Sequence, residues 1–224
     1  MLKKQTCIKD VAKAAGVSVS TVSRVLSDSQ VISEKTKEKV MKVVNSLDYK
    51  PNAIASALAK NRSNSIGIVI PDSDNEFYST SFFQEALRGI STIASDKGYD
   101  VLISPGKPSE YLAVRNLVER RKVDGIILLR AHINDKSIKF LYESHFPFVL
   151  IGSSKEYDDI YTVDNDNFKA AYELTNHLIE QGRRKIAFIG GSVNYVYARE
   201  RLEGYKKCIK DNKLLISPDL IKID

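Results

Sequence analysis

The chain has 224 residues, of which 43% are hydrophobic and 28% charged, and this composition is typical of a globular protein rather than a disordered one. No apolar run is long enough to cross a membrane, and the first ten residues lack the apolar segment of a signal peptide, so we expect a cytoplasmic protein. The net charge of +6 is unevenly placed: residues 1–62 hold 12 Lys and Arg against 5 Asp and Glu, whereas residues 63–224 hold 22 against 23. A basic module attached to a near-neutral body predicts a polyanionic partner for the module alone.

Two short amphipathic patterns separated by a glycine turn lie between Ile8 and Leu26. In the first, apolar residues recur at helical spacing: Ile8, Val11, Ala12 and Ala15. Gly16 supplies the freedom that a sharp turn needs, and Ser18 can cap the second helix. The second helix pairs an apolar side with a polar one, which carries Ser20, Thr21, Ser23 and Arg24. The pattern predicts a helix-turn-helix whose second helix reads the DNA major groove, although the spacing also fits any small helical hairpin.

A third helix is expected to begin at Ser33, a plausible N-cap. The three helices can share one small core made of Ile8, Val11, Val22, Val25, Val40, Val44 and Leu47. Pro51 ends the third helix and can open a new one, because the residue before a proline disfavours helical geometry. The segment after it is too short to be a stable helix alone, and we expect it to become helical only when something holds it.

From Ile66 onward, short continuous apolar runs alternate with helical stretches. Continuous runs are typical of parallel strands buried on both faces, so we expect a doubly wound α/β sheet that binds ligands at the carboxyl ends of its strands. Two further helices, at about 167–181 and 197–212, and a final strand-like run predict the start of a second lobe.

Binding chemistry is visible, whereas no catalytic, metal or cofactor site is expected, since no phosphate-loop or dinucleotide fingerprint and no ligand-like histidine spacing is found. Aromatic residues follow the first strand, where a ligand pocket would open: Phe77, Tyr78, Phe82 and Phe83. Such a mixture of rings and polar groups suits a sugar, but Phe82 and Phe83 can equally pack the next helix into the core. Asp164 either lines a site or belongs to a helix-capping cluster with Asn165 and Asp166. Tyr195 and Arg201 are the remaining candidates, because a guanidinium at a strand end can form paired hydrogen bonds to vicinal hydroxyls.

Motifs along the whole chain resemble the LacI/GalR family of bacterial transcription regulators. The resemblance rests on IKDVAKAAGVSVSTVSRVL at 8–26, LDYKPN at 47–52, VDN at 163–165, IAFIGG at 186–191 and RLEGY at 201–205. ISEKTKEKV, VDGIILL, FPFVLIG and VDNDN look most similar to the maltose operon repressors of Gram-positive bacteria. The implied fold is a three-helix DNA-binding domain and hinge helix followed by a doubly wound domain of the periplasmic-binding-protein type.

The resemblance implies a homodimeric repressor that binds a palindromic operator and is released by a sugar, with maltose or a maltodextrin as the expected effector. It implies DNA contacts by Ser18, Val19, Ser20, Thr21, Ser23, Arg24, Ser33, Asn52 and Ala55, and a minor-groove wedge at Leu58. Arg201 matches the arginine that many members use to bind effector. Expected domains are 1–50 for DNA binding, 51–62 for the hinge, 63–161 for the first lobe and 162–224 for a truncated second lobe, either as a fragment or as a shortened product. The alternatives are a relative that answers another sugar or a protein co-repressor, and a periplasmic-type sugar-binding protein.

Overall fold

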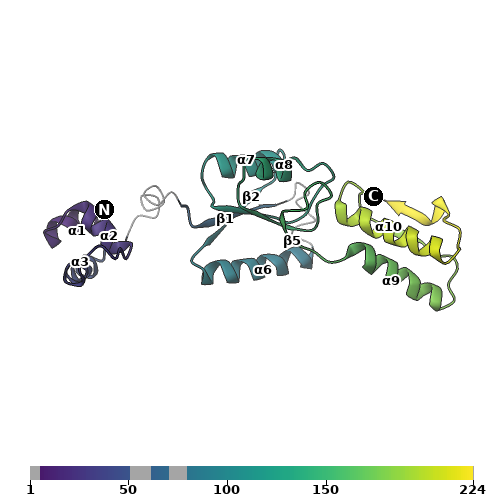
Figure 1. Ribbon diagram of the computed structural model, residues 1–224, viewed down its shortest axis with the longest axis horizontal. Coiled ribbons are helices and arrows are strands. Elements are labelled where there is room, and N and C mark those ends of the chain that lie inside the picture. The colour runs from purple at the N-terminus through teal and green to yellow at the C-terminus, as the bar shows by residue number, and fades with distance from the viewer. Residues whose placement is uncertain (1–5, 51–61, 71–79, 224) are drawn as a thin grey trace, which may run out of the picture. The chain divides into compact units, whose positions relative to one another are not determined.

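The computed structural model describes residues 6–50, 62–70 and 80–223. The chain divides into two compact units, Met1–Arg62 and Ser63–Asp224 (Figure 1). Each unit has its own hydrophobic core. Within the described ranges, no helix is both long enough and apolar enough to span a bilayer.

The first unit contains three helices, α1 (Ile8–Ala15), α2 (Val19–Leu26) and α3 (Glu34–Ser46). Gly16 ends α1 in the left-handed conformation, with φ 62°, which confirms the predicted glycine turn. Ser18 caps α2, since its Oγ accepts a hydrogen bond from the Thr21 backbone N–H at 3.0 Å. The helix-turn-helix expected from the sequence is therefore present.

Small aliphatic side chains form the core of this unit, namely Val11, Ala12, Ala15, Val22, Val25, Val40 and Val44. The expectation that Leu47 would join them is wrong, because α3 ends at Ser46 and Leu47, at the C-cap, is 36% exposed. Asp48 then adopts a φ of 44°, and the chain turns so that Tyr49 packs against the core instead.

The second unit begins with a five-stranded parallel sheet in the order β2-β1-β3-β4-β5. Its strands are β1 (Ser65–Ile70), β2 (Asp100–Pro105), β3 (Gly125–Leu128), β4 (Phe148–Ile151) and β5 (Tyr161–Val163). Because all strands run the same way, their carboxyl ends meet at one edge of the sheet. The doubly wound fold predicted from the apolar runs is confirmed, and β5 continues the first sheet to Val163.

Helices cover both faces of this sheet (Figure 1). α6 (Ser81–Asp96) lies on one face, while α7 (Glu110–Glu119) and α8 (Lys136–Glu143) lie on the other. Each side has its own apolar cluster. Phe83 and Ile68 belong to the cluster under α6, and Leu117, Leu141 and Leu150 belong to the one under α7 and α8.

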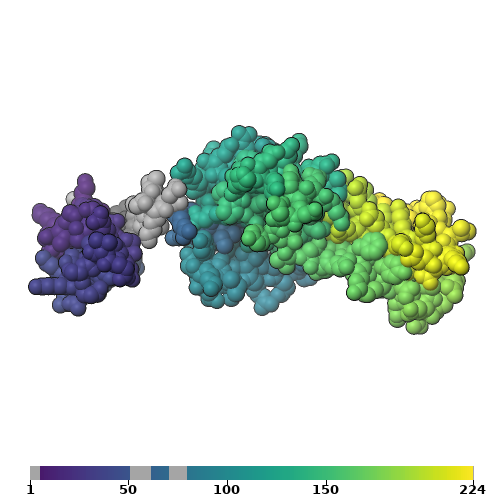
Figure 2. All heavy atoms as spheres, viewed as in Figure 1, coloured from purple at the N-terminus to yellow at the C-terminus, as the bar shows by residue number. Residues whose placement is uncertain are grey.

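The rest of the second unit consists of two long helices and a two-stranded parallel sheet. α9 (Asn167–Glu180) packs along α10 (Val196–Asp211), and their atoms touch along the green and yellow part of Figure 2. β6 (Phe188–Gly190) pairs with β7 (Ile221–Ile223), which follows the short 3-10 helix η1 (Pro218–Leu220). The two helices begin at the carboxyl edge of the first sheet, and this arrangement places their N-terminal turns beside a cavity at that edge.

Candidate functional site

The exposed face of α2 presents a short polar network at its N-terminal end. Ser18, at the cap, has its Oγ 2.7 Å from the Ser20 Oγ and 2.8 Å from the Thr21 Oγ1. Val19, between them, is 41% exposed although it is apolar. An exposed valine flanked by small hydroxyl side chains is a surface that can meet base edges, where apolar groups contact the thymine methyl and hydroxyls exchange hydrogen bonds.

Ser23 and Arg24 lie further along α2 and are both exposed. Over the part of the chain that the structure describes, the Arg24 guanidinium makes no hydrogen bond or ion pair, so it can reach a phosphate without breaking an existing contact. Lys37, by contrast, is already engaged. Its Nζ lies 3.1 Å from both the Asp28 and Glu34 carboxylates, and these hydrogen bonds raise the pKa of Lys37. It ties the loop after α2 to α3.

Ser33 occupies the N-cap position of α3, but its side chain does not bond to the backbone there. Its Oγ lies 3.0 Å from the Thr36 Oγ1 instead, and the residue is exposed. Three other residues expected to touch DNA, Asn52, Ala55 and Leu58, lie outside the described residues, as do Phe77 and Tyr78 of the expected effector site.

A cavity of about 300 Å³ opens at the carboxyl ends of β3, β4 and β5, the edge where a parallel sheet binds ligands. The start of α6, the segments after the three strands, and the first turns of α9 and α10 all contribute to its wall. The lining residues are Thr80, Phe82, Phe83, Leu129, Arg130, Ala131, Ile151, Gly152, Ser153, Asp164, Asn165, Asn167, Val196, Tyr197 and Arg201. Rings, amides, carboxylate and guanidinium groups thus share one hollow.

Arg201 is held in this cavity by residues that are distant in sequence. Its Nε donates to the Asn167 Oδ1 at 2.8 Å, and the Asn167 Nδ2 donates to the Asp164 Oδ1 at 3.1 Å. Asn167, which links the two hydrogen bonds, is only 3% exposed, so a buried side chain holds Arg201 in place. The guanidinium carbon of Arg201 also lies 5.2 Å from the centroid of the Tyr197 ring.

The two readings of the acidic cluster apply to different residues. Asp166 caps α9, because its carboxylate accepts from the Lys169 backbone N–H at 2.8 Å. Asp164 lines the cavity instead. The two phenylalanines both touch the cavity but differ in exposure: Phe83 is 7% exposed and packs mainly in the core, whereas Phe82 is 51% exposed at the cavity wall.

Arg130 is a cavity residue that sequence reasoning missed. It follows the buried strand β3, its side chain is 5% exposed, and its Nη2 lies 3.3 Å from the Glu110 Oε1. Burial alone would raise the pKa of Glu110, but the neighbouring His132 imidazole and the Arg130 charge outweigh burial and lower it. A charged residue directly after an apolar strand was the signal that could have found Arg130. Tyr195 is not among the described residues that line the cavity, and it lies against Arg130 instead, with the guanidinium 4.3 Å from its ring centroid.

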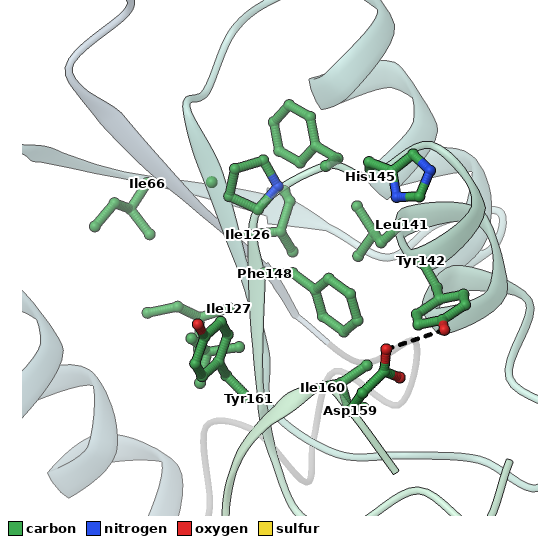
Figure 3. Close-up of a pocket in the computed structure, with 14 residues that line it drawn as sticks. Ile66, Ile126, Ile127, Leu141, Tyr142, His145, Phe148, Asp159, Ile160 and Tyr161 are labelled. Carbon is green, nitrogen blue, oxygen red and sulfur yellow. Dashed lines mark hydrogen bonds between the residues drawn. The ribbon is translucent and has the colours of Figure 1, made fainter. Parts of the chain in front are cut away.

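A larger cavity, of about 570 Å³, lies at the opposite, amino-terminal edge of the sheet. Figure 3 shows its mainly apolar walls, with Ile126, Leu141 and Phe148 facing the hollow, and the hydrogen bond from Tyr142 to Asp159 at its rim. Sugars need several converging polar groups, so the smaller cavity at the carboxyl edge is the better candidate for a carbohydrate site. Across the described ranges, no group of three or more potential metal ligands gathers at either place.

Comparisons with known sequences identify two adjoining regions of the chain. Residues 7–52 match the family model described as bacterial regulatory proteins, lacI family. Residues 63–220 match the model described as periplasmic binding proteins and sugar binding domain of LacI family.

Individual relatives agree with these two matches. The HTH-type transcriptional regulator MalR of Streptococcus pneumoniae is 42% identical over 209 residues, which cover 92% of this chain and 63% of that protein. Among solved structures, the lac repressor dimer bound to operator and the anti-inducer ONPF has a TM-score of 0.78 at 27% identity, covering 98% of this chain and 65% of that one. A complex of the regulator CelR with cellobiose has a TM-score of 0.66 at 27% identity, with coverages of 98% and 65%. The chain therefore spans less than two thirds of the length of these relatives.

Proposed function

Because the chain belongs to the LacI family of bacterial regulatory proteins, we propose that it represses sugar-utilisation genes by binding a palindromic operator and leaves the operator when a carbohydrate binds. The observation that carries the DNA half is the exposed face of α2, where Ser18, Val19 and Ser20 are open to solvent and the Arg24 guanidinium makes no hydrogen bond or ion pair within the described ranges. The surplus of positive charge in residues 1–62 supports the same proposal, since phosphate contacts need cations.

The observation that carries the sugar half is Arg201, which Asn167 holds at the wall of a polar cavity. When Nε is fixed, the planar guanidinium directs N–H groups from its two terminal nitrogens side by side. This geometry suits the adjacent hydroxyls of a pyranose ring. Phe82, which is exposed at the cavity wall, supplies a flat apolar surface for a C–H face of the sugar ring. Maltose or a maltodextrin is the proposed effector, supported by the 42% identity to MalR.

Domain roles follow from this proposal. We assign residues 1–50 to DNA binding, 51–62 to the hinge, and the remainder to two lobes that meet after β5. The division of the chain between Arg62 and Ser63 supports the boundary between the hinge and the first lobe. A homodimer, acting in the cytoplasm, is proposed because a palindrome presents two equivalent half-sites. Effector binding would favour a conformation with lower operator affinity.

The effector proposal is tested by isothermal titration calorimetry with maltose, maltotriose and cellobiose on the 224-residue chain. Maltose or maltotriose should bind, and Arg201→Lys should weaken binding about tenfold, because lysine cannot form the paired hydrogen bonds of a guanidinium. Arg199→Lys is the matched control. Arg199 lies on the same helix but not among the described cavity residues. The sugar affinity of the Arg199→Lys variant should therefore stay within about twofold of that of the unaltered chain.

Each other outcome contradicts a defined part of the proposal. Binding of cellobiose but of neither malto-oligosaccharide would contradict maltose as the effector. Cellobiose is the specific alternative because the chain is similar to the CelR–cellobiose complex. Equal losses of sugar affinity in Arg201→Lys and Arg199→Lys would show that the sugar does not bind in this cavity.

A further inference from the structure

Two arginines line the ligand cavity, and they come from different parts of the second unit. Arg130 follows β3 and Arg201 belongs to α10. Each lies over a tyrosine ring, with Arg130 4.3 Å from the centroid of Tyr195 and Arg201 5.2 Å from that of Tyr197. The two rings stack on each other, with centroids 5.5 Å apart and planes inclined by only 8°. The side chains thus form an unbroken series of Arg130, Tyr195, Tyr197 and Arg201.

Both ends of this series are anchored. Arg130 is paired with Glu110, and its side chain is 5% exposed. Arg201 donates its Nε to the buried Asn167. A cation over a ring face is attracted by the ring's negative face, and this attraction grows when water is largely excluded, as it is around Arg130.

The backbone fixes Tyr195 at the centre of the series. Tyr195 forms an isolated antiparallel bridge with His132, and the neighbouring hydrogen bonds run from Ile133 N to Asn194 O at 2.8 Å and from Val196 N to Ala131 O at 3.2 Å. The His132 ring also lies 4.7 Å from the Tyr195 ring. The segment after β3 therefore sets where the Tyr195 ring stands, and Tyr195, as the N-cap residue, joins that segment to α10.

We propose that Tyr195 is a positioning residue for Arg201, acting through the stacked ring of Tyr197 from outside the ligand cavity. The ring of Tyr195 supports Tyr197 from the side of β3, and Tyr197 in turn carries the Arg201 guanidinium at the cavity wall. Sugar affinity then depends on a ring that lines no part of the described cavity surface. The proposal rests on the proposed sugar site for its effect on affinity, but not for its effect on Arg201 itself.

The first test uses no sugar. Solvent exchange of the Arg201 Nε–H, which is bonded to Asn167, is measured by ¹⁵N NMR in the unaltered chain, Tyr195→Leu and Tyr195→Phe. Tyr195→Leu removes the ring and should speed exchange at least about fivefold, since the guanidinium loses its support. Tyr195→Phe keeps the ring and should leave the rate within about twofold. Tyr195→Met is the second ringless variant, used if the leucine variant does not keep the melting temperature of the unaltered chain.

An unchanged exchange rate in a folded ringless variant overturns the proposal. If the rate rises but no sugar in the panel binds the unaltered chain, the positioning role stands and the proposed sugar function fails. The two failures are therefore distinguishable.

The second test is a double-mutant cycle with the sugar that binds. Tyr195→Leu should weaken affinity about fivefold to tenfold in the unaltered chain, but less than about twofold in an Arg201→Lys background, because the ring acts through the guanidinium. Equal losses in both backgrounds would show that Tyr195 acts without Arg201 and would overturn the proposal. Tyr195→Phe should restore nearly all of the affinity.

Discussion

At Gly204, α10 approaches α9 closely enough that no side chain fits between them. A Cβ placed at Gly204 would lie 2.2 Å from the Phe168 carbonyl oxygen and 3.2 Å from the Tyr172 backbone nitrogen. Gly204→Ala should therefore destabilise the second unit by about 1–3 kcal/mol, because the helices must separate to admit a methyl group. Thermal and urea unfolding followed by circular dichroism measure this change.

Gly89 is the matched control, because it too lies inside a helix, α6, but a Cβ there would meet nothing within 4 Å. Gly89→Ala should raise stability by about 0.5–1 kcal/mol, since alanine loses less conformational freedom in a helix than glycine does. Similar changes in stability in the two variants would contradict the close approach of α9 and α10 at Gly204.

Residue types at the ligand cavity were easier to predict than their partners. Arg201 was expected there from its place after a strand, and it does line the cavity. Asn167 and Arg130 were not expected, because each owes its position to a partner far along the chain: Asn167 meets Arg201 across 34 residues, and Arg130 meets Glu110 across 20. A single sequence carries no record of such pairings. Tyr195 and Tyr197 are two residues apart at a helix start, and only the fold decides which of them faces the cavity.

At the scale of elements, the two serine N-caps of the first unit differ in what their side chains do. The Ser18 Oγ accepts from the Thr21 N–H, whereas the Ser33 Oγ makes no hydrogen bond to the backbone of α3 and lies beside the Thr36 hydroxyl. Ser18→Ala should cost about 1 kcal/mol of stability, because it leaves a backbone donor of α2 without its partner. Ser33→Ala should cost only a few tenths of that, since no backbone group loses a bond. Urea midpoints of the two variants, compared at equal denaturant slope, decide this prediction. Equal costs would contradict the capping difference.

Element types followed from the sequence because their signals are local. Helical spacing located α1 and α2, Gly16 located the turn, and continuous apolar runs located the buried strands. Leu47 was misplaced because the exact end of α3 depends on the turn at Asp48, which periodicity does not register. β5 shows a related limit, as all three of its side chains are exposed and only its pairing with β4 defines it as a strand.

At the scale of the whole molecule, charge and chemistry are divided between the two units. The first unit holds the surplus of cations and the exposed face of α2, and the second holds the polar cavity with Arg201. This division fits the proposed function, in which the first unit binds DNA and the second binds a sugar. Composition and motif spacing were sufficient to predict it, whereas the sugar and the operator depend on individual contacts.

Recognition of a specific DNA sequence by the face of α2 is tested by fluorescence anisotropy with a labelled duplex. The chain is titrated against a palindromic duplex selected from a random pool and against a scrambled duplex of the same composition, each between about 50 and 200 mM salt. The proposal predicts an affinity for the palindrome at least about 10³-fold higher than for the scrambled duplex at physiological salt, and a logarithm of affinity that falls linearly with the logarithm of salt concentration. Equal affinity for the two duplexes, or association that does not change with salt, would contradict it.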